Sequence, residues 1–138
     1  MHHLDWALIA LVGYSIFTPL ASLAMDNAPS SVVAMVANGI LLLSAVGLTV
    51  YENESVTSYF GGRTALYMVG AGVFLAVGIL AYYRALAAGP VSIVTPVYGM
   101  FLVGSTALSV LFLDDSLTLQ KGAGIALAVV AVYLTATG

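Results

Sequence analysis

Residues 85–96 read ALAAGPVSIVTP, and the fold of the whole chain follows from this stretch. It lies between two long apolar runs, residues 65–88 and 91–113, and leaves no room for a hydrophilic loop. Gly89 is suited to end the first helix in a left-handed conformation, and Pro90 is suited to the first turn of the next. Pro96 lies two turns inside that second helix, where it frees a backbone carbonyl and predicts a bend. The stretch therefore predicts two long helices joined by a very tight turn.

The composition predicts a membrane protein with several spans. Of the 138 residues, 62% are hydrophobic and 7% are charged, and the mean hydropathy is +1.09. Soluble domains carry about 25% charged residues, and a chain of this size leaves too much surface uncovered to hide so many apolar side chains. The absence of cysteine excludes disulfides and thiolate chemistry. A net charge of −3 argues against a basic face that binds nucleic acid.

Five apolar runs are long enough to cross the hydrocarbon core, which takes about 20 residues of helix. They cover about residues 6–25, 31–50, 65–88, 91–113 and 119–136. We therefore expect an all-α membrane protein in which residues 1–138 form a single domain of five transmembrane helices. The N-terminus lacks the basic start and small-residue cleavage site of a signal peptide, so the first run is expected to stay as a helix.

An odd number of spans places the two termini on opposite sides of the membrane. The N-terminal side carries Arg63 and Lys121, and the other side has only Arg84, about a turn and a half from its edge. The side richer in lysine and arginine faces the cytoplasm, so the count favours a cytoplasmic N-terminus in the cell membrane. A bias this small is also what a chain inserted in both orientations needs.

Polar side chains gather on one face of several predicted helices when residues are placed at 100° intervals. Close helix packing and back-bonding to the helix's own carbonyls are the alternative explanation for such faces. The packing explanation is less suited to tyrosines inside a span, such as Tyr14 and Tyr98, because their hydroxyls need a partner or water. Trp6, Tyr83 and Tyr133 lie near helix ends and are expected in the interfacial belt.

Arg84 is the one charged residue inside a predicted span. At the bilayer centre it would cost about 2.5–3.5 kcal/mol. It lies five residues before Gly89, so its side chain can snorkel to the interface. A contact with a solute or anion in a polar cavity, and a salt bridge to another subunit, remain alternatives.

The hairpin and the segments after it resemble the EamA-like transporter domain of the drug/metabolite transporter superfamily. The resemblance extends from about Tyr82 to Leu134 and rests on these residues: 82–86 (YYRAL), 89–92 (GPVS), Pro96, 112–118 (FLDDSLT), Gly124, Leu127, Val132 and Leu134. Two positions depart from the family pattern. Asp115 stands where glutamate is usual, which keeps the charge but shortens its reach, and Ala131 replaces a usual glycine.

The resemblance implies a transporter half. Members of the family commonly have two five-helix repeats of opposite orientation, and this chain looks like one repeat. It is therefore expected to move a small organic solute or metabolite by alternating access, as an antiparallel homodimer or with a homologous half. A structural or regulatory subunit that needs a different partner half is the alternative. An enzyme is disfavoured because the acids and bases of catalysis are lacking, and neither a cofactor nor a metal at His2 and His3 is expected.

The resemblance also implies that the first, third and fourth helices surround a cavity. The expected solute contacts are Tyr14, Thr18, Asn38, Tyr82, Arg84, Ser92, Thr95 and Tyr98. Helix bends or hinges are expected at Pro19, Gly89, Pro90 and Pro96. Because no span contains a carboxylate, a facilitator or exchanger is expected rather than a proton antiporter driven by a buried acid.

Overall fold

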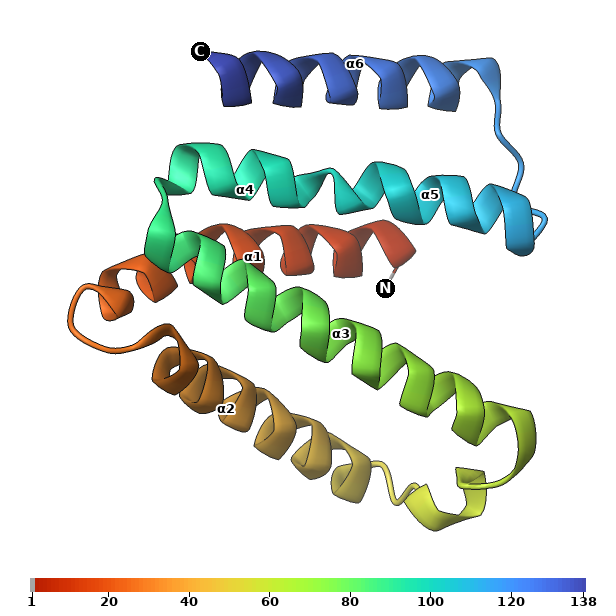
Figure 1. Ribbon diagram of the computed structural model, residues 1–138. Helices are drawn as coiled ribbons and strands as arrows, with labels where there is room; N and C mark the ends of the chain where they lie inside the picture. Colours follow the sequence, from red (N-terminus) through yellow and green to blue (C-terminus); the bar gives the residue numbers. More distant parts are fainter. Residues whose placement is uncertain (1) are drawn as a thin grey trace. The chain divides into compact units, whose positions relative to one another are not determined.

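The computed structural model describes residues 2–138, and every regular element in that range is helical (Figure 1). The helices are α1 (His3–Met25), α2 (Ser30–Tyr51), α3 (Gly62–Ala88), α4 (Val91–Gly99), α5 (Phe101–Phe112) and α6 (Leu119–Thr137), with a short 3₁₀ helix η1 (Val56–Tyr59) before α3. Since α4 and α5 follow one another as one span, the described chain has five helices long and apolar enough to cross a membrane. The prediction of an all-α membrane protein with five spans is confirmed.

The spans are covered by apolar side chains that point away from the protein. Leu43 is 73% exposed and Phe74 is 80% exposed, although both lie inside predicted spans. Exposed apolar area on this scale is far beyond the isolated patches of a soluble protein. In a membrane the same side chains contact lipid, while the helices satisfy their own backbone hydrogen bonds. The protein is therefore built for a bilayer.

Two of the helices begin directly after a proline. Pro29 is the N-cap of α2 and Pro90 is the N-cap of α4, with φ values of −58° and −68°. Each proline carbonyl accepts the first N–H bonds of its helix: from Val32 and Val33 in α2, and from Ile93 and Val94 in α4. The proline ring already fixes the required φ and brings no N–H that would need a partner at a helix start. These prolines therefore set where the two helices begin.

The left-handed cap predicted at Gly89 is wrong. Within residues 2–138, positive φ values occur at Asn53, Gly62 and Asp114, and Gly89 forms a simple bend after α3. The reason lies in the next residue, because the ring of Pro90 restricts the residue before it to extended conformations. The glycine that does need its freedom is Gly62, with φ 65° at the start of α3.

The fourth span is interrupted later than predicted. The sequence predicts a bend at Pro96, but Pro96 lies inside α4 and the helix breaks at Met100. The Met100 N–H bonds to the Val97 carbonyl at 3.1 Å, three residues back instead of four. Pro96 supplies no N–H to the preceding turn, and Gly99 is a poor helix former directly before the break. Pro96 therefore weakens the turn before it, and Gly99 weakens the helix directly before the tightened turn at Met100.

The chain divides into two compact units, one up to Ala87 and the other Ala88–Gly138. The single domain expected over residues 1–138 stays a prediction. In the second unit, α6 lies beside α4 and α5 (Figure 1).

In the first unit the buried residues gather where the end of α1, the start of α2 and the end of α3 meet. Ala21 and Ala34 permit close approach there, and Tyr83, only 2% exposed, fills the space between them.

Candidate functional site

A groove of about 300 Å³ opens between the three long helices of the first unit. Its walls combine small, aliphatic and aromatic side chains with one amide: Ala10, Gly13, Tyr14 and Phe17 from α1, Ala37, Asn38 and Leu41 from α2, and Ile79 and Tyr83 from α3. The volume is at the lower end of the range for small-molecule pockets, which are mostly apolar with a few placed polar groups. The groove is therefore of a suitable size and composition for a small solute.

One wall of the groove is a chain of three aromatic rings. The rings of Tyr14 and Phe17 pack edge to face, with centroids 6.1 Å apart and planes at 82°. Phe17 packs in the same way on Tyr83, at 5.8 Å and 80°. Edge-to-face packing is the favoured arrangement because the positive ring edge meets the negative ring face. The three rings hold one another in place and form a stable surface for a ligand.

The amide of Asn38 supplies the polar group of the α2 wall. Its Nδ2 donates to the Ala34 carbonyl at 2.8 Å, one turn earlier in the same helix. Among residues 2–138 its Oδ1 accepts no bond, and no side-chain oxygen there is both buried and unpaired, so this oxygen is accessible on a residue that lines the groove. An amide oxygen in this position can accept a hydrogen bond from a bound molecule.

Tyr14 and Asn38 both lie far from the ends of their helices. Tyr14 is the central residue of α1, so about 16 Å of helix extends on either side of it. Asn38 lies eight residues after the start of α2, or about 12 Å from that end. Since the hydrocarbon core is about 30 Å thick, both groups are at the depth of the bilayer middle. Polar groups at that depth are costly without a partner and often mark a pathway.

Thr18 and Tyr82 form a hydrogen-bonded pair next to the groove rather than part of its wall. Their hydroxyl oxygens are 3.1 Å apart, and the two residues are 5% and 4% exposed. Thr18 also donates to the Tyr14 carbonyl at 3.1 Å, so it can accept from Tyr82 at the same time. The pair joins α1 to α3. Solute contact by Thr18 and Tyr82 stays a prediction, and their observed partners give them a structural role.

Phe17 and Tyr83 are groove residues that the sequence interpretation missed. Tyr83 was expected in the interfacial belt because it lies near the end of its run, but it is buried against α1 and α2. The spacing of Tyr14 and Phe17, three residues apart, was a usable signal, since residues three apart share a helix face. Ile79 and Tyr83, four apart, carry the same signal on α3. The interfacial assignment of Tyr83 is therefore corrected.

Arg84 has an exposed side chain, and within residues 2–138 it makes no hydrogen bond or ion pair. It lies four residues before the end of α3, which is about 6 Å of helix. That distance is within reach of a snorkelling arginine. The groove between α1, α2 and α3 does not include Arg84, so its solute contact stays a prediction.

Three further predicted contacts belong to α4 in the second unit. Ser92 is exposed, and Thr95 and Tyr98 are half-buried. The ring of Tyr98 lies 5.1 Å from that of Phe101, across the break between α4 and α5. Of the four predicted hinge residues, Pro19 lies inside a continuous α1. Gly89, Pro90 and Pro96 lie at or near the ends of α4. A hinge function for Pro19, Gly89, Pro90 and Pro96 stays a prediction.

The second unit has its own groove of about 340 Å³ between α5 and α6. Its lining is aliphatic or small apart from Thr106 and Lys121. The Thr106 hydroxyl donates to the Leu102 carbonyl of its own helix at 2.8 Å. The Lys121 side chain bonds to the loop between α5 and α6. The mid-membrane polar groups therefore favour the groove of the first unit as the candidate site, although the second is slightly larger.

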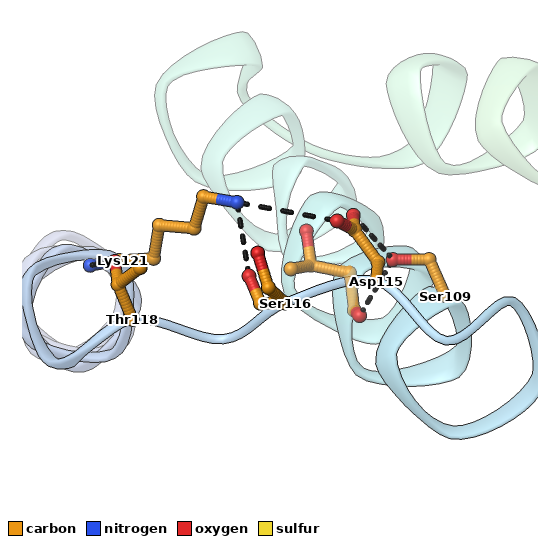
Figure 2. Close-up of polar contacts among 6 residues, drawn as sticks. Ser109, Asp115, Ser116, Thr118 and Lys121 are labelled. Atoms are coloured by element: carbon orange, nitrogen blue, oxygen red, sulfur yellow. Dashed lines mark hydrogen bonds and ion pairs between the residues drawn. The ribbon is translucent and has the colours of Figure 1, made fainter.

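Figure 2 shows the polar contacts that fix the α5–α6 loop. The Lys121 Nζ donates to the Ser116 carbonyl at 2.9 Å and lies 4.0 Å from Asp115 Oδ1. The Ser109 hydroxyl donates to Asp115 Oδ2 at 3.4 Å, and the Thr118 hydroxyl caps α6 by accepting from the Lys121 N–H at 3.2 Å. Residues 115–118 (DSLT), part of the family-like stretch 112–118, thus have a clear structural function: they close the loop and start the last helix.

The site shows no arrangement typical of metal binding. Across residues 2–138, no three His, Asp or Glu side chains come together as a candidate metal site. His2 and His3 lie exposed at the N-terminus, next to one another. The chemistry available in the groove is therefore hydrogen bonding and aromatic packing.

Comparison with known proteins gives one family and one relative. A sequence model of the EamA-like transporter family matches residues 4–137, almost the whole chain. An uncharacterized protein of Methanocaldococcus jannaschii is 29% identical over 127 residues, which cover 92% of this chain and 90% of that protein. The relative is thus of similar length. No solved structure matches the chain.

Proposed function

We propose that the chain, which belongs to the EamA-like transporter family, is one half of a membrane transporter that moves a small organic solute. In this proposal two copies insert in opposite orientations and form an antiparallel homodimer in the cell membrane. The solute binds near the middle of the bilayer, and rocking of the two halves opens the site to each side in turn.

The observation that carries the proposal is the number of spans. The five helices long and apolar enough to cross a membrane are an odd number, which supports opposite sides for the two ends of this chain. Two copies in opposite orientations then reproduce the inverted repeats from which many transporters are built.

The distribution of positive charge fits insertion in both directions. Of the three lysine and arginine residues, Arg63 and Lys121 lie on the N-terminal side and Arg84 lies near the opposite edge. Orientation follows the excess of such residues on the cytoplasmic side. An excess of one positive residue favours a cytoplasmic N-terminus. This bias is too small to exclude the opposite orientation.

The mechanism uses the groove as a half-site. Tyr14 and Asn38 contact the solute in each copy. The other proposed solute contacts are Thr18, Tyr82, Arg84, Ser92, Thr95 and Tyr98. The prolines inside α1 and α4, Pro19 and Pro96, allow these helices to bend as the site opens and closes.

The transporter is proposed to be a facilitator or exchanger. The six acidic residues lie in the first turn of α1 or in the loops: Asp5, Asp26, Glu52, Glu54, Asp114 and Asp115. A proton-coupled carrier usually places a carboxylate inside the membrane, where burial brings its pKa into the working range. Transport that persists without a pH gradient in proteoliposomes would agree with this part of the proposal.

The decisive experiment measures orientation in the membrane. The chain has no cysteine, so a single cysteine placed after Gly138 can be labelled with an impermeant maleimide in intact cells. Permeabilised cells give the total, and roughly half of that total labelled in intact cells is the expected result. Complete labelling or none means one orientation. That result would refute the antiparallel homodimer and favour a subunit that works with a different partner half.

A further inference from the structure

We infer that the groove of the first unit selects uncharged solutes that pair a flat apolar surface with a hydrogen-bond donor. This inference rests on the proposed function for its claim that such a solute is transported. It adds what the fold and the family do not specify, which is the chemistry of the bound molecule.

The lining excludes ionised solutes. None of the nine residues that line the groove is an aspartate, glutamate, lysine, arginine or histidine. A charged solute that entered would lose its hydration and find no opposite charge, which is strongly unfavourable at this depth. Arg84 and the acidic residues lie outside this set. A neutral molecule has no such cost.

One polar group of the groove, the Asn38 amide oxygen, is complementary to a hydrogen-bond donor on the solute. Because Asn38 Nδ2 is held at the Ala34 carbonyl, the Oδ1 on the other side of the planar amide is directed away from the helix backbone. That oxygen can only accept. An N–H or O–H group on the solute is its complement, and a solute without one would leave the oxygen unpaired in an apolar setting.

The aromatic wall specifies a flat apolar surface next to that donor. Tyr14, Phe17 and Tyr83 are fixed by their edge-to-face contacts, so a ring of the solute can pack against them without rearrangement. Next to these rings the α1 wall leaves room, since a Cβ placed on Gly13 would meet nothing within 4 Å. Ring packing on one side and one hydrogen bond on the other describe a small heteroaromatic or similar molecule.

Three matched probes test this chemistry on the purified full chain in lipid nanodiscs. Indole is flat, neutral and carries one N–H donor. 1-Methylindole has the same ring without the donor, and indole-3-acetate adds a negative charge. Binding of radiolabelled indole is measured directly, with protein-free nanodiscs as the blank, and the other two are measured as competitors. Loss of one neutral hydrogen bond predicts roughly three- to tenfold weaker competition by 1-methylindole, and the anion should compete less than either.

Two sets of variants locate the binding in the groove. Asn38→Leu should weaken indole binding roughly three- to tenfold and remove the preference for indole over 1-methylindole. Gly13→Leu should abolish binding by filling the groove. Gly47→Leu is its matched control, because Gly47 also has open space around it and does not line the groove.

The outcomes separate this inference from the proposed function. If 1-methylindole competes as well as indole, the groove recognises apolar surface alone, as it would a lipid acyl chain, and the inference is wrong. It is equally wrong if Gly13→Leu and Gly47→Leu bind alike, a comparison that holds even if Asn38→Leu does not fold. Donor-dependent binding together with a single membrane orientation would leave the inference standing and remove the antiparallel homodimer.

Discussion

The hydrogen bond between Thr18 and Tyr82 should contribute measurably to stability, and a double-mutant cycle can isolate its contribution. Thr18→Val and Tyr82→Phe each remove one hydroxyl and keep most of the side-chain shape. The two oxygens are 3.1 Å apart and both residues are nearly buried, so each single change leaves the other hydroxyl without this partner. Each hydroxyl has other contacts, such as the bond from Thr18 to the Tyr14 carbonyl, and the cycle cancels these.

The expected coupling is modest because hydrogen bonds between membrane helices are modest. Measured values for such pairs average about 0.6 kcal/mol and reach about 1.7 kcal/mol. We expect this pair in the upper half of that range, since both oxygens are almost fully removed from the surroundings. Each single substitution should cost about 1 kcal/mol of unfolding free energy. The free energies come from titration of the micelle-bound protein with a denaturing detergent, followed by circular dichroism.

A matched control uses Thr49→Val in place of Thr18→Val. The Thr49 hydroxyl donates to the Ala45 carbonyl at 2.8 Å, in the same way that the Thr18 hydroxyl donates to the Tyr14 carbonyl. Within the described chain, however, Thr49 has no hydroxyl partner on another helix. Thr49→Val and Tyr82→Phe should therefore be additive within about 0.5 kcal/mol. If the Thr18 cycle is equally additive, the bond between α1 and α3 does not stabilise the fold, and the reasoning is refuted.

Three further substitutions test the helix ends and the broken span. Gly62→Ala should lower the unfolding free energy by about 1–2 kcal/mol, because Gly62 has φ 65°, a left-handed conformation that is unfavourable for alanine. Its control is Gly61→Ala, which has equally open space and should change the unfolding free energy by less than about 0.5 kcal/mol. Thr118→Ala should cost about 1 kcal/mol through loss of the α6 cap, and Thr118→Ser should restore most of it. Pro96→Ala should make α4 and α5 more continuous, seen as slower amide hydrogen exchange at Met100; unchanged exchange would show that Pro96 does not cause the break.

The helices themselves follow directly from the sequence. A run of about 20 apolar residues can satisfy its backbone in lipid only as a helix, so existence and length need no tertiary information. Pro29 and Pro90 also mark helix starts through a local constraint. Gly89 shows the limit of such reasoning, because a glycine suited to a left-handed cap is overruled by the proline that follows it.

The groove could be predicted only in part. A helical wheel places Tyr14, Thr18 and Asn38 on faces that point inward, but it does not say which hydroxyl meets another helix and which remains available. That choice depends on how closely α1, α2 and α3 approach one another, and Ala21 of α1 and Ala34 of α2 lie in the buried cluster where they meet. The burial of Tyr83 is a result of the same convergence. Its position near a helix end does not indicate this burial, although its four-residue spacing from Ile79 does.

The two short turns, Asp26–Pro29 and Gly89–Pro90, have a consequence for how the orientation of the chain can evolve. Together they hold no lysine or arginine, and in the proposed five-span topology they are the connections on the side opposite the N-terminus. With two positive residues near one side and one near the other, a lysine replacing Asn27 would equalise the count, and a second would reverse the excess. Since an excess of one positive residue excludes neither orientation, one or two codon changes in these turns would remove or reverse the bias, and fixing one orientation takes a larger excess.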